Sequence, residues 1–159
     1  MGILDFLKPP SYSDPTVGTL VRQGRYWRGR ITLGSDGDAP LLLAGRRAAP
    51  GEASLGLARE LGSRYPALRP AIERALFDHY EPYSHAAESG EVDPLDDEVP
   101  RLDRPEHVWG HVALVRVLIE PLSGVDTVEI AYRTDWDKEH TVGARFQSWA
   151  LVELNGSVI

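Results

Sequence analysis

The helical pattern of this chain lies in one block between two groups of β-compatible runs. Runs rich in β-branched and aromatic residues occur before residue 45 and after residue 111, whereas apolar residues at steps of three and four are confined to residues 54–80. Because helices and strands do not alternate, a parallel sheet with helices on both faces is disfavoured. We therefore expect an α+β fold in which antiparallel β-meanders pack against helices.

Two prolines divide the helical block. Ser54 can cap a first helix, which we expect to end near residues 62–65. Pro66 and Pro70 are tolerated only near the start of a helix, because proline lacks the backbone N–H and its ring collides with the preceding turn. A second amphipathic helix is therefore expected over residues 67–80. The pattern predicts a kinked pair of helices rather than one straight rod.

Seven runs have strand character, three before the helices and four after them. Turn-forming residues separate neighbouring runs, which favours antiparallel hairpins. In the second run Trp27 alternates with arginines, so we expect its indole in the core. The runs cover residues 17–21, 26–33, 41–44, 112–119, 127–132, 142–146 and 150–154.

The composition restricts the class of protein. A chain of 159 residues with 42% hydrophobic residues fits one domain, so we expect a single α+β domain over residues 1–159. The absence of cysteine excludes disulfides, a thiolate nucleophile and cysteine-based metal sites. The apolar runs are far shorter than the roughly 18 to 20 residues of a membrane helix. We expect a cytoplasmic protein that has no contact with a membrane.

Charge is divided unequally between the halves of the chain. Residues 1–75 carry a net charge of +4 and residues 76–159 a net charge of −11. Segment 81–104 has no apolar periodicity and is rich in Pro, Gly, Ser, Asp and Glu, so we expect a long acidic surface loop there. An acidic surface attracts a basic protein partner and repels phosphates, so no nucleic acid is expected even though arginine outnumbers lysine fifteen to two.

A second acidic cluster lies in the turn at residues 135–140. It combines three carboxylates with an indole and an imidazole, but Phe146 stands where a calcium loop needs its twelfth-position glutamate. No nucleophile accompanies the cluster, so we predict no catalytic residue and interpret the turn as a binding surface. The predicted partner-binding residues of the loop and the turn are Asp96, Asp97, Glu98, Asp135, Trp136, Asp137 and Glu139.

Metal chemistry is the alternative that the sequence leaves open. His107 and His111 are four residues apart, but the first lacks the adjacent glutamate of a zinc protease, so we expect no metal and no cofactor. A small metal-dependent hydrolase would instead need the histidines to converge with Asp137, Glu139 and His140 in one pocket. A housekeeping scaffold whose acidity serves solubility is the third hypothesis.

Several short motifs carry a resemblance to known proteins. They are MGILDFL at residues 1–7, GTL at 18–20 followed by YWRG at 26–29, ALFDHY at 75–80 and WDKEH at 136–140. With these motifs the chain resembles a broad family of uncharacterised bacterial single-domain proteins, over nearly its whole length. Some relatives of this kind are thought to be immunity proteins of bacterial toxin systems. The resemblance thus implies a non-catalytic interaction protein or inhibitor, and it brings no site residues with it.

Overall fold

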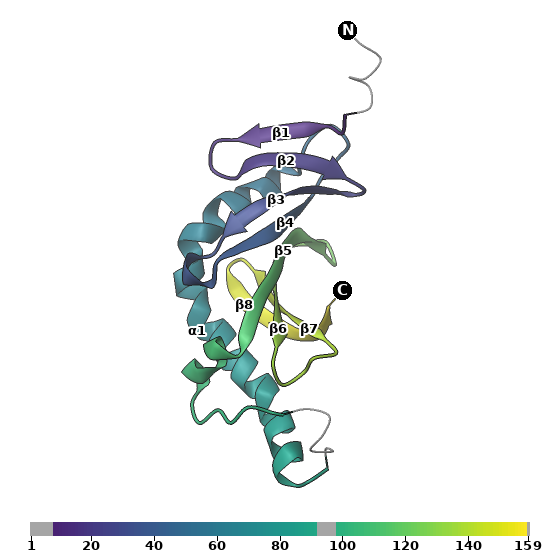
Figure 1. Ribbon diagram of the computed structural model, residues 1–159. Coiled ribbons are helices and arrows are strands. Elements are labelled where there is room, and N and C mark those ends of the chain that lie inside the picture. The colour runs from purple at the N-terminus through teal and green to yellow at the C-terminus, as the bar shows by residue number, and fades with distance from the viewer. Residues whose placement is uncertain (1–7, 92–97, 159) are drawn as a thin grey trace.

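The strands form one continuous sheet in the computed structural model, which describes residues 8–91 and 98–158 (Figure 1). Within those residues the sheet has eight strands in sequence order. Neighbouring strands are antiparallel except β4 and β5, which are parallel. The strands are β1 (Ser11–Asp14), β2 (Gly18–Gln23), β3 (Tyr26–Thr32), β4 (Asp38–Ala44), β5 (Val112–Leu122), β6 (Val125–Thr134), β7 (Thr141–Gln147) and β8 (Ala150–Val158).

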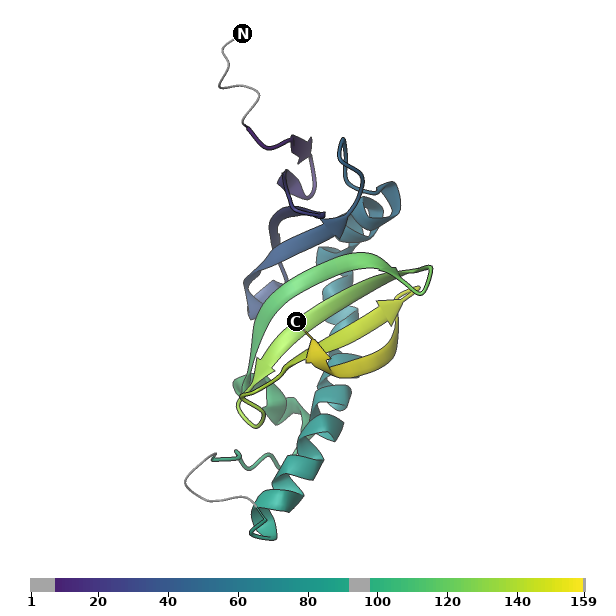
Figure 2. The ribbon, with the colours of Figure 1, turned by 90° about the vertical axis from the view of Figure 1, so that its right-hand side faces the viewer.

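One long helix, α1 (Glu52–Glu88), connects β4 to β5 and covers one face of the sheet (Figures 1 and 2). Parallel neighbours need such a crossover, whereas antiparallel neighbours are joined by turns. The predicted fold class is therefore wrong in two respects. The helices are not a pair, and the two meanders are not separate, because the β4–β5 pairing joins them into one sheet.

The helix continues through Pro66, Pro70 and Pro82. All three prolines are exposed, so the carbonyl groups that lose an N–H partner lie on the side of the helix that faces water. The opposite side keeps an unbroken apolar stripe, which includes Leu61 and Ile72. Packing of that stripe on the sheet stabilises the helix across positions that would end an isolated one.

The core lies between α1 and the inner face of the sheet. Leu41 pairs with Val117, and Val117 pairs with Ile130, so their side chains form an apolar row across three strands. Trp27 is fully buried, which confirms its predicted place in the core. The side chains in this layer include Leu20, Leu41, Leu43, Leu61, Ile72, Leu76, Val117, Ile119, Ile130 and Phe146.

Helix α1 extends into the segment predicted to be a loop. It ends at Glu88, so the loop expected from residue 81 begins only after that residue. Asp96 and Asp97 lie outside the described residues. A short 3-10 helix, η3 (Pro105–Gly110), then leads into β5, and another, η2 (Gly34–Asp36), precedes β4. Across the described ranges, no helix has both the length and the apolar character required to cross a bilayer.

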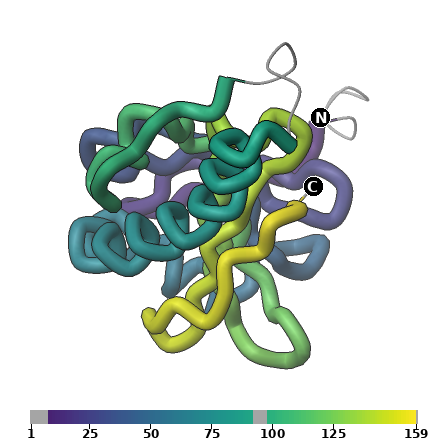
Figure 3. The backbone as a smooth tube through the Cα atoms, turned by 90° about the horizontal axis from the view of Figure 1, so that it is seen from below, coloured from purple at the N-terminus to yellow at the C-terminus, as the bar shows by residue number. Residues whose placement is uncertain are grey.

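The half of the sheet formed by β5 to β8 is strongly curved (Figure 2). Bulges interrupt the β5–β6 register near Leu114 and the β7–β8 register at two places. Bulges bend and twist the strands that contain them. The β5–β6 and β7–β8 turns extend on the same side of the molecule (Figure 3), where Val125 and Ser148 share a shallow depression with the start of α1.

Candidate functional site

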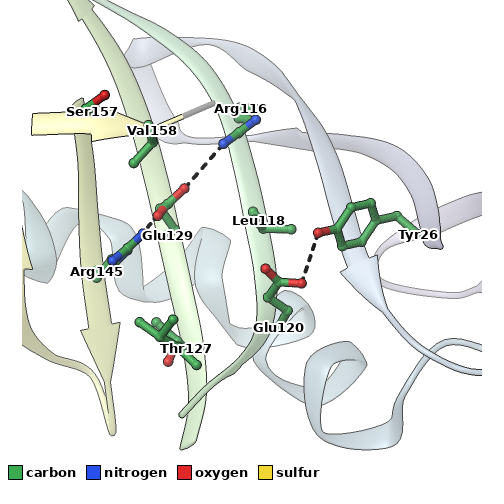
Figure 4. Close-up of a pocket in the computed structure, with 10 residues that line it drawn as sticks. Tyr26, Arg116, Leu118, Glu120, Thr127, Glu129, Arg145, Ser157 and Val158 are labelled. Atoms are coloured by element: carbon green, nitrogen blue, oxygen red, sulfur yellow. Dashed lines mark hydrogen bonds and ion pairs between the residues drawn. The ribbon is translucent and has the colours of Figure 1, made fainter. Parts of the chain in front are cut away.

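A cavity of about 310 Å³ lies on the sheet face opposite α1 (Figure 4). Its lining residues on β5 alternate with Val117 and Ile119, which point toward the helix, and residues at the end of β8 complete one wall. The lining therefore belongs to the outer face of the sheet. The lining residues are Tyr26, Arg116, Leu118, Glu120, Leu122, Thr127, Glu129, Arg145, Ser157 and Val158.

A buried carboxylate lies between two arginines in this cavity (Figure 4). The Glu129 side chain is 8% exposed, and its Oε2 accepts a hydrogen bond of 2.6 Å from Arg145 Nε. Its Oε1 lies 3.4 Å from Arg116 Nη2. Arg145 also donates through Nη1 to Glu153 at 2.6 Å. Burial alone would lower the pKa of Arg145, but these carboxylates outweigh it and raise the pKa, so the guanidinium stays charged.

Gly143 on β7 leaves room for this carboxylate. A Cβ atom at that position would lie 2.9 Å from Cγ and Cδ of Glu129 and 2.9 Å from Cγ1 of Val158. A Cβ atom at such distances would force Glu129 or Val158 to move, so the glycine permits their close approach and the burial of Glu129.

The other end of the cavity holds a second polar group (Figure 4). The Tyr26 hydroxyl donates to Glu120 Oε2 at 3.0 Å, and Arg25 Nη2 donates to the same oxygen at 2.9 Å. Burial and the neighbouring carboxylate raise the pKa of Tyr26. Leu118 separates this pair from Arg116 along β5. Along β5 the cavity therefore passes from Arg116 through Leu118 to Glu120, whose charge is paired with Arg25.

None of the residues in this cluster was among the predicted site residues. A signal was present, because Arg116, Glu129 and Arg145 each interrupt an otherwise apolar β-compatible run. Charged residues inside strands that alternate with buried ones indicate a polar outer face. The pairing among three strands, however, could not be read from the spacing of the residues.

Two of the predicted binding residues are buried in the structure. Trp136 is 2% exposed, and its Nε1 donates to Nδ1 of His79 on α1 at 3.0 Å. Burial lowers the pKa of His79, which agrees with a neutral ring that accepts this bond. The ring of Trp136 also contacts Tyr80 edge to face. The indole therefore anchors the β6–β7 turn to the helix.

The carboxylate of Asp137 also stabilises the β6–β7 turn through hydrogen bonds. It is 6% exposed and accepts hydrogen bonds from the Tyr83 hydroxyl at 2.7 Å and from the backbone N–H groups of Glu139 and His140 at 3.2 Å. Burial would raise the pKa of Asp137, but the hydrogen bonds from Tyr83 and His140 lower it. Burial and that carboxylate in turn raise the pKa of Tyr83 to about 12.

Three of the predicted acids are exposed at this same end of the molecule. Glu98 and Asp135, which are distant in the sequence, line one shallow depression of about 530 Å³ together with His111 and Lys138. Asp135 Oδ2 lies 3.0 Å from His111 Nδ1, and its side chain is 63% exposed. Glu139 lines the adjoining depression beside Trp136. We call Glu98, Asp135 and Glu139 the acidic end.

The histidines are distributed among different contacts. His79 accepts from Trp136, His111 contacts Asp135, and His140 contacts Asp137. Within residues 8–91 and 98–158, no group of three or more His, Asp or Glu side chains could hold a metal ion. The metal-dependent hydrolase stays a prediction that none of these contacts supports.

Comparison with known proteins gives the family but not the activity. No curated protein and no solved structure matches the chain. A family profile matches residues 16–158, a range that contains α1 and every strand from β2 to β8. The chain therefore belongs to the family described as a domain of unknown function, DUF6985.

Proposed function

We propose that the chain is a non-catalytic protein-interaction domain whose acidic end docks on a basic protein partner. The observation that carries this proposal is that Glu98 lies beside Asp135, with Glu139 in the adjoining depression. Two acidic segments that are separate in the sequence thus form one surface. Charge of one sign on a surface speeds encounter with an oppositely charged partner and favours it over others.

The acidic end keeps most of its charge. Within the described residues neither Glu98 nor Glu139 makes an ion pair, and the Asp135 carboxylate contacts His111. Lys138 lies in the same depressions, so three acids face one lysine there. The exposed acids Glu81 and Glu88, near the end of α1, add to the negative charge of this half. The carboxylates of the acidic end are therefore available to a cationic partner.

The basic half of the chain does little to neutralise the acidic half. Arg59 pairs with Asp14 and Arg69 with Asp36, so these ion pairs stay within the first half. Among the described residues, the ion pairs that join the two halves are those of Arg25 with Glu120 and of Arg74 with Asp78, and both arginines are largely exposed. The excess of negative charge therefore remains on the surface of the second half.

A role as an immunity protein or similar inhibitor is the finer form of this proposal. It rests on the resemblance carried by the short motifs and on the acidic end, which suits a basic toxin. The alternative hypotheses, a metal-dependent hydrolase and a housekeeping scaffold, have no comparable surface or cluster in their favour.

The test compares two sets of three neutralising substitutions in the tagged full chain. The first set, Glu98→Gln, Asp135→Asn and Glu139→Gln, removes the acidic end. The control set, Glu52→Gln, Glu60→Gln and Asp126→Asn, removes the same charge from exposed acids near the start of α1 and the β5–β6 turn. Proteins that co-purify with the unmodified chain from its native cell supply the partner, and association rates are then measured at several salt concentrations.

We expect the first set to slow association about tenfold at low salt and to weaken its salt dependence, while the control set changes little. Asp96→Asn and Asp97→Asn, added to Glu98→Gln, test the acidic loop separately. Equal effects of the first and control sets would show that only net charge matters. A rate unchanged by the first set would remove the acidic end from the mechanism.

A further inference from the structure

Arg116 has more hydrogen-bond donors than the surrounding protein uses. A guanidinium carries five N–H donors, and within the described residues Arg116 makes one hydrogen bond, the long one of 3.4 Å to Glu129. Its Nε is buried without a hydrogen-bond partner in the described residues. The side chain is 23% exposed, so its Nη end reaches the cavity. Nε is enclosed by protein, whereas the Nη donors that reach the cavity are free to bond an acceptor that enters it.

The local charge favours an anionic acceptor. Arg145 is satisfied by two bonds of 2.6 Å, whereas Arg116 shares only the second oxygen of the same carboxylate. Arg116, Arg145 and Glu129 together carry a net charge of +1. Glu153 lies on the outer side of Arg145 and is 49% exposed, so water screens its charge. A guanidinium pairs best with a carboxylate, which can accept two parallel hydrogen bonds.

The walls of the cavity determine the size and polarity of the rest of the ligand. Leu118 and Val158 supply apolar surface next to Arg116, and Leu122 lies beyond Glu120 on β5. The volume of about 310 Å³ is at the small end of ligand pockets, which suits a molecule with a short apolar tail. At the far end Glu120 is paired with Arg25, so that end offers no unpaired cation to a second carboxylate on the ligand.

We propose that this cavity binds a small organic monocarboxylate. The carboxylate accepts hydrogen bonds from the Nη donors of Arg116, and the tail lies over Leu118 and Val158. This site is on the outer face of the sheet, and it is separate from the acidic end proposed to dock on a protein.

The test is a titration of the ¹⁵N-labelled full chain with hexanoate, followed by NMR at the Arg116 Nε–H signal. Hexanol has the same tail without the charge, and adipate has a second carboxylate at the far end. We expect hexanoate to shift the Arg116 signal in a saturable manner, and hexanol and adipate to bind at least about tenfold more weakly. Equal binding of hexanol and hexanoate, or the lack of a saturable shift, would overturn the proposal.

Variants locate the site. Arg116→Gln should weaken binding of hexanoate about tenfold or more, whereas Arg47→Gln, at an exposed arginine between β4 and α1, should leave it unchanged. Ser157→Trp keeps the ionic cluster and places a large ring at an exposed position of the cavity wall, so it should abolish binding in a folded protein. Binding that survives Ser157→Trp, or that Arg47→Gln weakens as much as Arg116→Gln, would refute the assignment.

Discussion

The two faces of the sheet bury their residues by different means. Ile130 and Glu129 are neighbours on β6, and both are nearly inaccessible, at 0% and 6% exposure. Ile130 is covered by the apolar layer beneath α1, whereas Glu129 is enclosed by two arginines and the end of β8. Apolar burial stabilises a fold directly, but a buried ion pair barely recovers the cost of its own desolvation. This difference is the reason why we propose binding, rather than stability, as the role of the ionic cluster on the outer face.

The largest effect is expected on the outer face. Glu129→Ala leaves Arg116 and Arg145 buried without their shared carboxylate, which should lower the free energy of unfolding by about 3–5 kcal/mol. Urea denaturation monitored by tryptophan fluorescence measures the change. Arg28→Ala, at an exposed arginine, serves as the control and should change stability by less than about 0.5 kcal/mol. A loss below about 1 kcal/mol for Glu129→Ala would mean that water already screens the cluster.

A triple variant separates stability from binding on the same face. Replacing Glu129 with Leu and both Arg116 and Arg145 with Met substitutes apolar groups for the whole ionic cluster. Such replacements are often neutral or stabilising, so the triple variant should be at least as stable as the original chain in the same urea experiment. It should nevertheless fail to bind hexanoate. A triple variant as unstable as Glu129→Ala would show that the cluster holds the sheet together.

The inner face gives the next largest effect. Ile130→Ala removes buried methyl groups beneath the helix and should cost about 2–5 kcal/mol, measured by the same denaturation. Leu118→Ala is the control on the outer face, where the leucine is only partly buried, and it should cost less than Ile130→Ala. Equal costs would mean that both faces of the sheet are packed alike.

Features set by neighbouring residues could be predicted from the sequence. Each of the seven predicted β-compatible runs overlaps a strand, and two of them extend one residue beyond it, because alternation and turn residues act over a few positions. Strand β1 was missed, since its residues Ser11 to Asp14 are polar and only pairing with β2 makes them a strand. The break predicted at Pro66 and Pro70 is absent, because the direction in which a proline faces depends on where the sheet lies.

Features set by distant contacts could not be predicted. The approach of Glu98 to Asp135 and the pairing of β4 with β5 depend on the whole fold. The burial of Trp136 depends on His79, which α1 supplies. The turn at residues 135–140 was located correctly, but its side chains are divided between core and surface in a way that only the helix determines.

A substitution at Gly143 tests how tightly the side chains of the outer face are packed. Gly143→Ala would place a Cβ atom within 2.9 Å of Glu129 and Val158, so we expect a loss of about 1–3 kcal/mol of unfolding free energy and weaker binding of hexanoate. Gly110→Ala is the control, because a Cβ atom there would have no neighbour within 4 Å. A Gly143→Ala protein that kept both properties would show that the end of β8 moves aside without cost.

An ion pair beside the helix should depend on pH. Arg59 and the backbone N–H groups of Val17 and Thr16 lower the pKa of Asp14 from 3.8 to about 2. Because the folded pKa is the lower one, this contribution to stability is present above about pH 4 and is lost as the pH falls toward 2. The difference in melting temperature between the original chain and Asp14→Asn should therefore shrink over this window. A difference that stays constant from pH 6 to pH 2 would contradict the pairing.

The smallest effect on stability is expected at the turn between β7 and β8, the last two strands of the sheet. Both of its central residues, Ser148 and Trp149, have positive φ, of 49° and 61°. Two-residue hairpin turns of this kind favour Asn-Gly, and a bulky residue in the left-handed region is strained. The Trp149 ring lies under the guanidinium of Arg64 on α1, at 4.9 Å, a contact worth about 0.5–1 kcal/mol where exposed.

Two substitutions at Trp149 distinguish the cost of backbone strain at this residue from the gain of its contact with Arg64. Trp149→Ala keeps the strain and loses the contact with Arg64, whereas Trp149→Gly loses both, so the glycine variant should be the more stable by about 1 kcal/mol in urea denaturation. The opposite order would show that the backbone is not strained. A glycine variant that also matches or exceeds the original chain would mean that this tryptophan is retained against stability. An aromatic side chain that is retained at a cost in stability is typical of a contact surface. That result would add the β7–β8 turn to the surfaces at which a partner should be sought.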